Sequence, residues 1–130
     1  MSRIITIGET LLDIIFQHQQ PVSATPGGSP LNSSISLARL GADVHFVTDF
    51  GKDQVGDLIE QFMQNNGIHT SFIERYENYH SAVALAFLDE QKDASYSFYK
   101  DFPDERLSHI SVDFREDDIL LFGSFFAITD

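Results

Sequence analysis

Short apolar runs alternate with amphipathic segments through the first half of the chain, and this order limits the possible folds. Residues 4–7 and 44–48 are apolar runs of the length typical of strands buried on both faces. Each run is followed by a segment, residues 29–41 or residues 53–67, in which apolar side chains recur at helical spacing. Because strand–helix repeats bring their strands side by side, this order predicts a parallel α/β sheet.

Both predicted helices have clear end signals. Ser29 is a favoured N-cap residue, and Pro30 suits the first helical position. Asp53 is placed to begin the second helix. Gly41 and Gly67 can adopt the left-handed conformation that ends a helix.

The second half of the chain has a different pattern. Residues 81–88 and 95–99 are rich in β-forming residues and are separated by a polar segment, which predicts a hairpin. Residues 119–122 return to the pattern of a buried strand, and little sequence follows them. We therefore expect the chain to end within a strand–helix–strand unit. Residues 17–30 are polar and rich in Pro, Gly and Ser, which predicts a loop.

The formal net charge is -12, from 20 acidic and 8 basic residues. Such a surface repels phosphate backbones and anionic membranes, so we expect neither nucleic-acid nor membrane partners. The absence of cysteine excludes disulfides and thiolate metal sites. No apolar run reaches the roughly 18 residues that span a bilayer, and the first residues lack a signal peptide. We expect a cytoplasmic protein.

Asp13 interrupts an apolar run at residues 11–16, where a lone carboxylate is costly unless it has partners. One interpretation is that it accepts hydrogen bonds from two hydroxyl groups of a ligand. The other is that it caps a nearby backbone at the end of a strand. The residues alone weigh these two interpretations equally.

Gly27 and Gly28 precede the first predicted helix, where glycines let a ligand approach backbone N–H groups closely. A plain turn is the alternative, and the pattern is neither Walker A nor GxGxxG. Asn32 lies in the first helical turn, where its amide could bind a hydroxyl or simply be solvated. The histidines show no pair at metal-ligand spacing, and acidic residues 116–118 indicate a solvated turn, so we assign no metal site.

Short motifs occur in a fixed order along the chain. They are Gly8-Glu9-x-Leu11-x-Asp13, Pro26-Gly27-Gly28-Ser29-x-x-Asn32, Ala38-Arg39-Leu40-Gly41 and Gly51-Lys52-Asp53-x-x-Gly56. Each is weak alone, but their order and spacing resemble the N-terminal signature of ribokinase-like (pfkB) carbohydrate kinases over essentially the whole chain. The first motif and residues 96–100 are similar to those of fructokinase-like members.

This resemblance implies an α/β fold, with residues 1–130 forming the N-terminal part of a ribokinase-like kinase domain. The expected architecture is a Rossmann-like αβα parallel sheet, incomplete here, with a small β-sheet lid inserted at residues 10–24 and 79–101. The implied activity is ATP-dependent phosphorylation of a sugar hydroxyl. In this family the lid closes over the sugar and often builds a dimer, so we expect a homodimer or larger assembly through the lid.

The resemblance also implies a set of sugar-contacting residues: Asp13, Gly27, Gly28, Asn32, Phe98, Tyr99 and Lys100. Among them, Phe98 or Tyr99 would form a wall of the sugar pocket. Lys100 stands where several relatives that bind acidic sugars have an arginine. Because lysine lacks the bidentate fork of arginine, this position disfavours an acidic sugar.

The sequence departs from the family pattern in length and in its catalytic motifs. We find neither the Gly-Ala-Gly-Asp segment, which supplies the general base and an anion hole, nor the Asn-x-x-Glu segment that helps to place magnesium. We therefore expect no catalytic residue and no metal or cofactor site in this chain, whose C-terminal ATP-binding half would be absent. ATP and Mg²⁺ would be used by the complete enzyme, and the chain alone would be inactive.

Two functional hypotheses follow. In the first, the chain supplies the sugar site and lid of a sugar kinase. In the second, it is a non-catalytic, truncated sugar-binding or dimerisation module. The DNA after the codon for Asp130 would distinguish them. A dinucleotide-binding domain is disfavoured because no GxGxxG follows the first strand.

Overall fold

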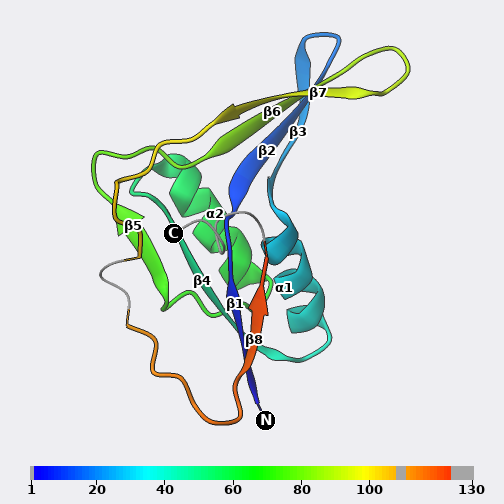
Figure 1. The fold of residues 1–130 in the computed structure, drawn as a ribbon. Coiled ribbons are helices and arrows are strands. Elements are labelled where there is room, and N and C mark those ends of the chain that lie inside the picture. The colour runs from blue at the N-terminus through cyan, green and yellow to red at the C-terminus, as the bar shows by residue number, and fades with distance from the viewer. Residues whose placement is uncertain (1, 108–110, 124–130) are drawn as a thin grey trace.

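A computed structural model describes residues 2–107 and 111–123, which form two sheets and two helices (Figure 1). In chain order the elements are β1 (Arg3–Ile7), β2 (Leu11–Gln17), β3 (Gln20–Gly27), α1 (Ser29–Arg39), β4 (Asp43–Gly51), α2 (Gln54–Asn65), β5 (Ile73–Tyr76), β6 (Val83–Leu88), β7 (Ala94–Tyr99) and β8 (Ile119–Phe122). The first sheet has the strand order β5-β4-β1-β8, and the second has the order β3-β2-β6-β7.

The first sheet is parallel at each of its pairings, which confirms the predicted α/β class. One face of β4 presents Val44, Phe46 and Phe50, which alternate along the strand and therefore point the same way. They form one buried cluster with Leu31 and Ile35 of α1 and with Ile59 and Met63 of α2. Both helices thus cover the same face of the parallel sheet.

The other face of the parallel sheet is held by charged contacts with the long segment between β7 and β8. The Arg3 guanidinium donates to Asp118 Oδ2 at 2.7 Å and to the Asp113 carbonyl at 2.8 Å. Hydrogen bonding and opposite charge from Arg3 lower the pKa of Asp118 to about 2. This pair fastens the segment beside the first residues of β1.

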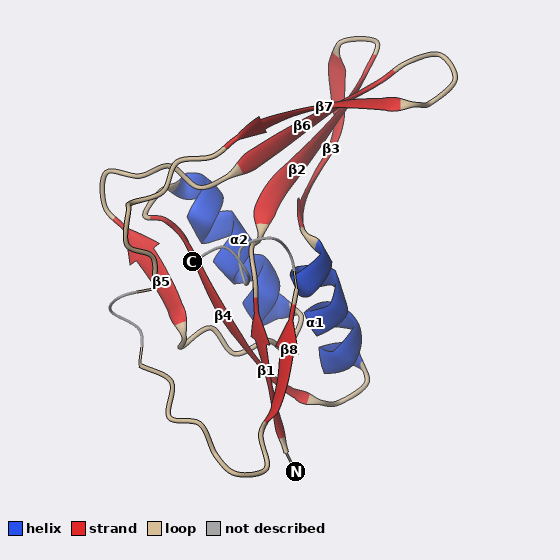
Figure 2. Ribbon diagram, viewed as in Figure 1, coloured by secondary structure: helices blue, strands red, loops and turns tan. Residues whose placement is uncertain are grey.

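The second sheet projects away from the helices as a single layer, and we call it the lid (Figure 2). Its hairpin, β6 with β7, was predicted and is confirmed. Its outer strand β3 was not, because residues 17–30 were expected to be a loop. The polar, Pro-containing sequence suits an edge strand, where one side needs no ladder partner, and β3 is exposed over its first six residues.

The helix ends follow the sequence signals with one correction. Ser29 is not the N-cap: the cap is Gly28, whose φ of 106° is open to glycine and strained for other residues. Gly41 and Gly67 have φ of 92° and 81° and end the two helices as predicted. Asp53 caps α2, also as predicted.

The last strand was expected at residues 119–122, and β8 has those bounds. Its predicted burial is wrong within the described part of the chain, where Ile119, Leu120 and Phe122 are each about half exposed. The expected end of the chain within a strand–helix–strand unit concerns residues 124–130, which lie outside the described residues. No helix of the described residues is both long enough and apolar enough to cross a membrane.

Candidate functional site

The predicted site residues gather where the strands of the parallel sheet end and the lid begins. In open parallel sheets, ligands bind in the crevice beyond the carboxyl ends of the strands. Here β1 ends at Ile7, and the chain passes through Glu9 and Thr10 directly into β2 of the lid. The buried Thr10 hydroxyl donates to the Gly27 carbonyl at 2.8 Å. This hydrogen bond links the start of β2 to the end of β3.

Asp13 lies in β2, and its carboxylate rests directly against Gly27, so any side chain at position 27 would overlap Asp13 Oδ2. Burial raises the pKa of Asp13. Within the described residues no donor satisfies this carboxylate, so the capping interpretation gains no support. An acceptor held in this way suits a ligand that supplies the missing donors.

Gly28 stands between this carboxylate and the start of α1. Its backbone crosses so close to the Glu9 carbonyl that an added Cβ would lie 3.0 Å from that oxygen. No side chain caps the N-terminus of α1. Asn32 follows in the first turn, where its backbone N–H bonds to the Gly28 carbonyl and the residue is exposed.

The strand register places Asp13, Ala84 and Phe98 in one row across three strands of the lid. Residues in register share a face of the sheet, so all three side chains point to the same side. Between the carboxylate and the aromatic ring, Ala84 contributes only a methyl group. Tyr99, one residue further along β7, points to the opposite side.

Lys100 directly follows β7, and its side chain lies near the end of β1. Its Nζ lies 3.2 Å from Glu9 Oε2 and 5.7 Å from the centre of the Phe98 ring. Lys100 is therefore brought to the site, but its charge is already engaged by a carboxylate.

A second ionic contact beside Glu9 was not foreseen from the sequence. Arg106 donates two hydrogen bonds to Asp49, at 2.6 and 2.8 Å, and a third to Glu9 Oε1 at 3.2 Å. The side chain of Asp49 is fully buried near the end of β4. Tyr76 also donates to Asp49, at 2.7 Å. Burial raises the pKa of Tyr76, and the Asp49 carboxylate raises it further. The network fastens the segment after the lid over the carboxyl end of the sheet.

Asp53 joins the parallel sheet domain to the lid. Its carboxylate accepts from Gly56 N, Ser81 N and Ser81 Oγ, each at 2.7 Å. Burial alone would raise the Asp53 pKa, but these bonds and nearby Arg75 outweigh it, so the pKa is lowered. Since Ser81 leads into β6, this residue ties the start of α2 to the base of the lid.

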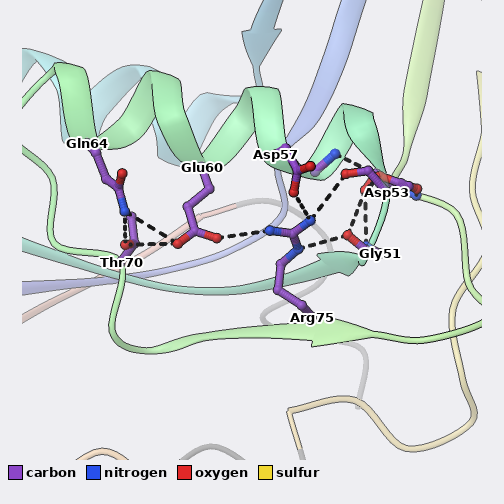
Figure 3. Close-up of polar contacts among 9 residues, drawn as sticks. Gly51, Asp53, Asp57, Glu60, Gln64, Thr70 and Arg75 are labelled. Atoms are coloured by element: carbon purple, nitrogen blue, oxygen red, sulfur yellow. Dashed lines mark hydrogen bonds and ion pairs between the residues drawn. The ribbon is translucent and has the colours of Figure 1, made fainter.

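Arg75 extends the same junction along α2 (Figure 3). Its guanidinium donates to the Gly51 carbonyl at 2.8 Å, to Asp57 at 2.9 Å and to Glu60 at 3.0 Å. The Gly51 and Gly56 positions of the motif are explained by space: a side chain at either would overlap backbone or the Arg75 guanidinium. This motif therefore builds the junction rather than a ligand contact.

A cavity of about 720 Å³ lies between the start of α2 and the lid. Three predicted site residues, Phe98, Tyr99 and Lys100, line it. Its other lining residues are Asp53, Gln54, Val55, His80, Ser81, Val83, Leu85 and Asp101. The structure thus divides the predicted set: Asp13, Gly27 and Gly28 lie together, and the β7 residues border this cavity.

Comparison with known proteins matches residues 1–124 to one family, described as pfkB family carbohydrate kinase. An aminoimidazole riboside kinase from Salmonella typhimurium is 28% identical over 98 residues, covering 75% of this chain and 31% of that protein. A fructokinase from Escherichia coli is 24% identical over 97 residues, covering 75% and 32%. A 5-dehydro-2-deoxygluconokinase from Geobacillus thermodenitrificans is 39% identical over 77 residues, covering 58% and 23%.

Solved structures show the same likeness. Fructokinase from Xylella fastidiosa with bound ATP superposes with a TM-score of 0.67 at 30% identity, covering 76% of this chain and 33% of that one. The fructokinase of Halothermothrix orenii gives 0.69 at 21% identity, covering 75% and 37%. This chain spans about a third of the length of the relatives that it matches.

Proposed function

This chain belongs to the pfkB family of carbohydrate kinases, and from that premise we propose that it supplies the sugar-binding part and the lid of a sugar kinase. The proposed reaction is fructokinase-like, the ATP- and Mg²⁺-dependent phosphorylation of a sugar hydroxyl, in the cytoplasm and without nucleic-acid or membrane partners. The alternative, a non-catalytic sugar-binding or dimerisation module, uses the same sugar site.

The observation that carries this proposal is the carboxylate of Asp13, which is partly buried against Gly27 and lacks a donor among the described residues. Two adjacent sugar hydroxyls can both donate to one carboxylate, in charge-assisted hydrogen bonds that are stronger than neutral ones. The backbone of Gly28, which is partly buried, and the exposed amide of Asn32 would bind further hydroxyls of the same ring.

The lid row supplies the apolar part of the proposed pocket. Ala84, which is buried, carries only a methyl group on the middle strand, and Phe98 would form a wall on the side of the sheet that carries Asp13. A sugar ring has apolar C–H faces as well as hydroxyls, so one acid and one aromatic wall on a single sheet face suit it. We propose Phe98 as the wall and assign Tyr99, on the other face, no contact with the sugar.

The charges favour a neutral sugar. Lys100 is paired with Glu9, and Arg106 is paired with both Asp49 and Glu9, so each cation near the site already faces carboxylates. A carboxylate or phosphate on the substrate would have to displace these partners and would also face Asp13. Uncharged hydroxyls meet neither cost.

The described residues do not fit the phosphates of ATP. Helix N-termini attract phosphate, but the start of α1 lies beside the Asp13 carboxylate and the start of α2 is capped by Asp53. We therefore assign ATP and Mg²⁺ to no residue described here and derive no transfer step. The role proposed for Asp13 is to orient the sugar hydroxyls.

Titration calorimetry of the chain with fructose and other neutral sugars tests the proposal. We expect Asp13→Asn to weaken binding by about 10- to 100-fold, the worth of a hydrogen bond to a charged group. Because the pKa of Asp13 is raised, acidification should weaken sugar binding at a higher pH than for an ordinary aspartate. Glu90→Gln, the matching change in the exposed turn of the lid, should leave binding unchanged.

Stability separates a binding role from a structural one. A carboxylate whose folded pKa is raised contributes stability below its unfolded pKa, and that contribution is lost as the pH rises through the folded value. At neutral pH the charged Asp13 therefore opposes folding, and Asp13→Asn should unfold at the same temperature as the native chain or higher. Sugar binding that is equal in Asp13→Asn and the native chain would refute the proposed site.

We extend the proposal to a homodimer formed through the lid. Phe16 and Phe87 stack on the lid face opposite Asp13, with ring centres 4.8 Å apart, and Phe87 is exposed. Exposed aromatic surface of this kind is favourably buried against a second copy. In sedimentation equilibrium, Phe87→Ser should shift the chain to monomer, while Leu120→Ser, at the exposed β8, should not. The opposite pattern would place association at β8.

A further inference from the structure

Asp43, His45 and His69 form a cluster on the face of the parallel sheet that the helices leave open. Asp43 Oδ1 lies 3.0 Å from His45 Nε2 and 3.1 Å from His69 Nε2. Ligand atoms of all three residues lie within 4.8 Å of one another. The two histidines are 24 positions apart, so sequence spacing gave no sign of the pair.

The backbone holds these residues in place. Asp43 and His45 alternate along β4 and so share one face. His69 follows α2 and forms a parallel bridge beside β4, with its N–H donating to Val44 at 2.9 Å and its carbonyl accepting from Phe46 at 3.2 Å. The sheet backbone therefore brings the three residues together.

We propose that Asp43, His45 and His69 bind a divalent transition metal ion, with Zn²⁺ as the preferred occupant. Two imidazole nitrogens and one carboxylate oxygen are donors that Zn²⁺ accepts, and water can complete a four-coordinate site. Bonds of about 2.0–2.1 Å in a tetrahedron set neighbouring ligand atoms roughly 3.3 Å apart. The observed 3.0 and 3.1 Å come within a few tenths of an ångström of that spacing.

One side chain must rotate for the ion to enter. The imidazole rings stack with centres 4.3 Å apart and planes 19° from parallel, whereas a metal ion binds in the plane of each ring. The His45 side chain is 14% exposed, and Phe72 lies against its ring. The His69 side chain is 56% exposed, so it can turn out of its stacking on His45. Metal binding should therefore move His69 and leave His45 in place.

The environment of His45 sets the expected affinity. The His45 imidazole is largely buried beside Asp43, and its Nε2 lies 3.0 Å from Asp43 Oδ1. Its Nδ1 is buried without a partner among the described residues. Strong metal sites usually hydrogen-bond that second nitrogen. We therefore expect micromolar rather than nanomolar binding.

The cluster is separate from the proposed sugar site. Asp43 is the first residue of β4, whereas Asp49 and its partner Arg106 lie toward the other end of that strand. An ion here would not contact the sugar. It would link β4 to the segment that follows α2 and so stabilise the folded chain.

Calorimetric titration with Zn²⁺ tests the proposal, using the chain without a histidine tag. We expect one ion per chain, a rise in unfolding temperature at saturation, and a visible absorption band when Co²⁺ replaces Zn²⁺. His69→Gln should lower the affinity by more than the roughly 10- to 100-fold cost of losing an outer hydrogen-bond partner, and should abolish both the stabilisation and the Co²⁺ band. His69 is exposed, so this variant should fold even if His45→Gln does not.

His18→Gln is the matched control, because His18 is an exposed histidine in the lid turn. It should bind Zn²⁺ as the native chain does. Equal Zn²⁺ affinity in the native chain and His69→Gln would overturn the proposal, as would binding that gives no stabilisation. Because neither readout involves sugar, the result is independent of the proposed kinase function.

Discussion

The parallel sheet and the lid use similar apolar side chains in opposite ways. In the parallel sheet, Phe46 is fully buried between α1 and α2. In the lid, Phe98 is 59% exposed, and most of the sheet projects beyond the helices (Figure 2). The first region is held by its core, and the second by its backbone ladder and a few polar attachments. The comparison predicts that truncating an exposed aromatic residue of the lid costs little stability, as its role in the proposed binding site requires.

Hydrogen bonds and an ion pair connect the lid to the parallel sheet. Asp53 binds Ser81, and Lys100 pairs with Glu9. Such contacts fix the orientation of the lid, whose base also buries the side chains of Leu12, Ala82 and Ala84. Variants can therefore test whether the lid unfolds separately from the core.

Phenylalanine truncation in the two regions should give the largest difference. Phe46→Ala removes a fully buried ring and should lower the free energy of unfolding by about 3–5 kcal/mol. Phe98→Ala removes a largely exposed ring and should change it by about 0.5 kcal/mol or less. Urea unfolding followed by circular dichroism measures both.

The same two variants should reverse their order in sugar binding. Phe98→Ala should weaken it, because the ring would no longer form a wall of the pocket. A loss of several kcal/mol of stability in Phe98→Ala would instead show that the lid shares the core, and the comparison would fail.

The region with periodic burial was also the region that the sequence predicted well. Helical spacing of apolar residues identified α1 and α2 because the helices are covered on one side only. Asp13 could be singled out because it interrupts an apolar run. By contrast, β3 has no such pattern, since its first six residues are all exposed at the edge of the lid.

Contacts between distant residues were beyond sequence reasoning. Arg106 and Asp49 are 57 positions apart, and nothing in their local sequence marks either as half of a buried pair. His45 and His69 meet only because the segment after α2 returns beside β4. These contacts depend on tertiary folding and become visible only when the strands are placed.

Asp53 gives a prediction of intermediate size, because it belongs to both regions. Asp53→Ala removes the N-cap of α2 and the anchor of Ser81, and should cost about 1–2 kcal/mol. Hydrogen exchange should also accelerate at the amides of β6 more than at those of β4. Asp57→Ala is the control, since the Asp57 side chain is largely exposed and, within the described residues, forms an ion pair with Arg75. Equal acceleration in both strands would mean that lid and core unfold as one unit.

The ion pair between Lys100 and Glu9 should show the smallest effect and gives the finest test of how the lid is attached. Lys100 is substantially exposed, so the pair gains little Coulomb energy and is screened by salt. A double-mutant cycle of Lys100→Gln and Glu9→Gln, measured by urea unfolding, should give a coupling of about 0.2–1 kcal/mol that falls as salt is added. Because Glu9 also pairs with Arg106, the single variant Glu9→Gln should cost more than Lys100→Gln. A coupling above about 2 kcal/mol that salt does not reduce would mean that the pair is desolvated. The lid would then be closed onto the core as part of it, and the contrast between the two regions would hold only for their aromatic side chains.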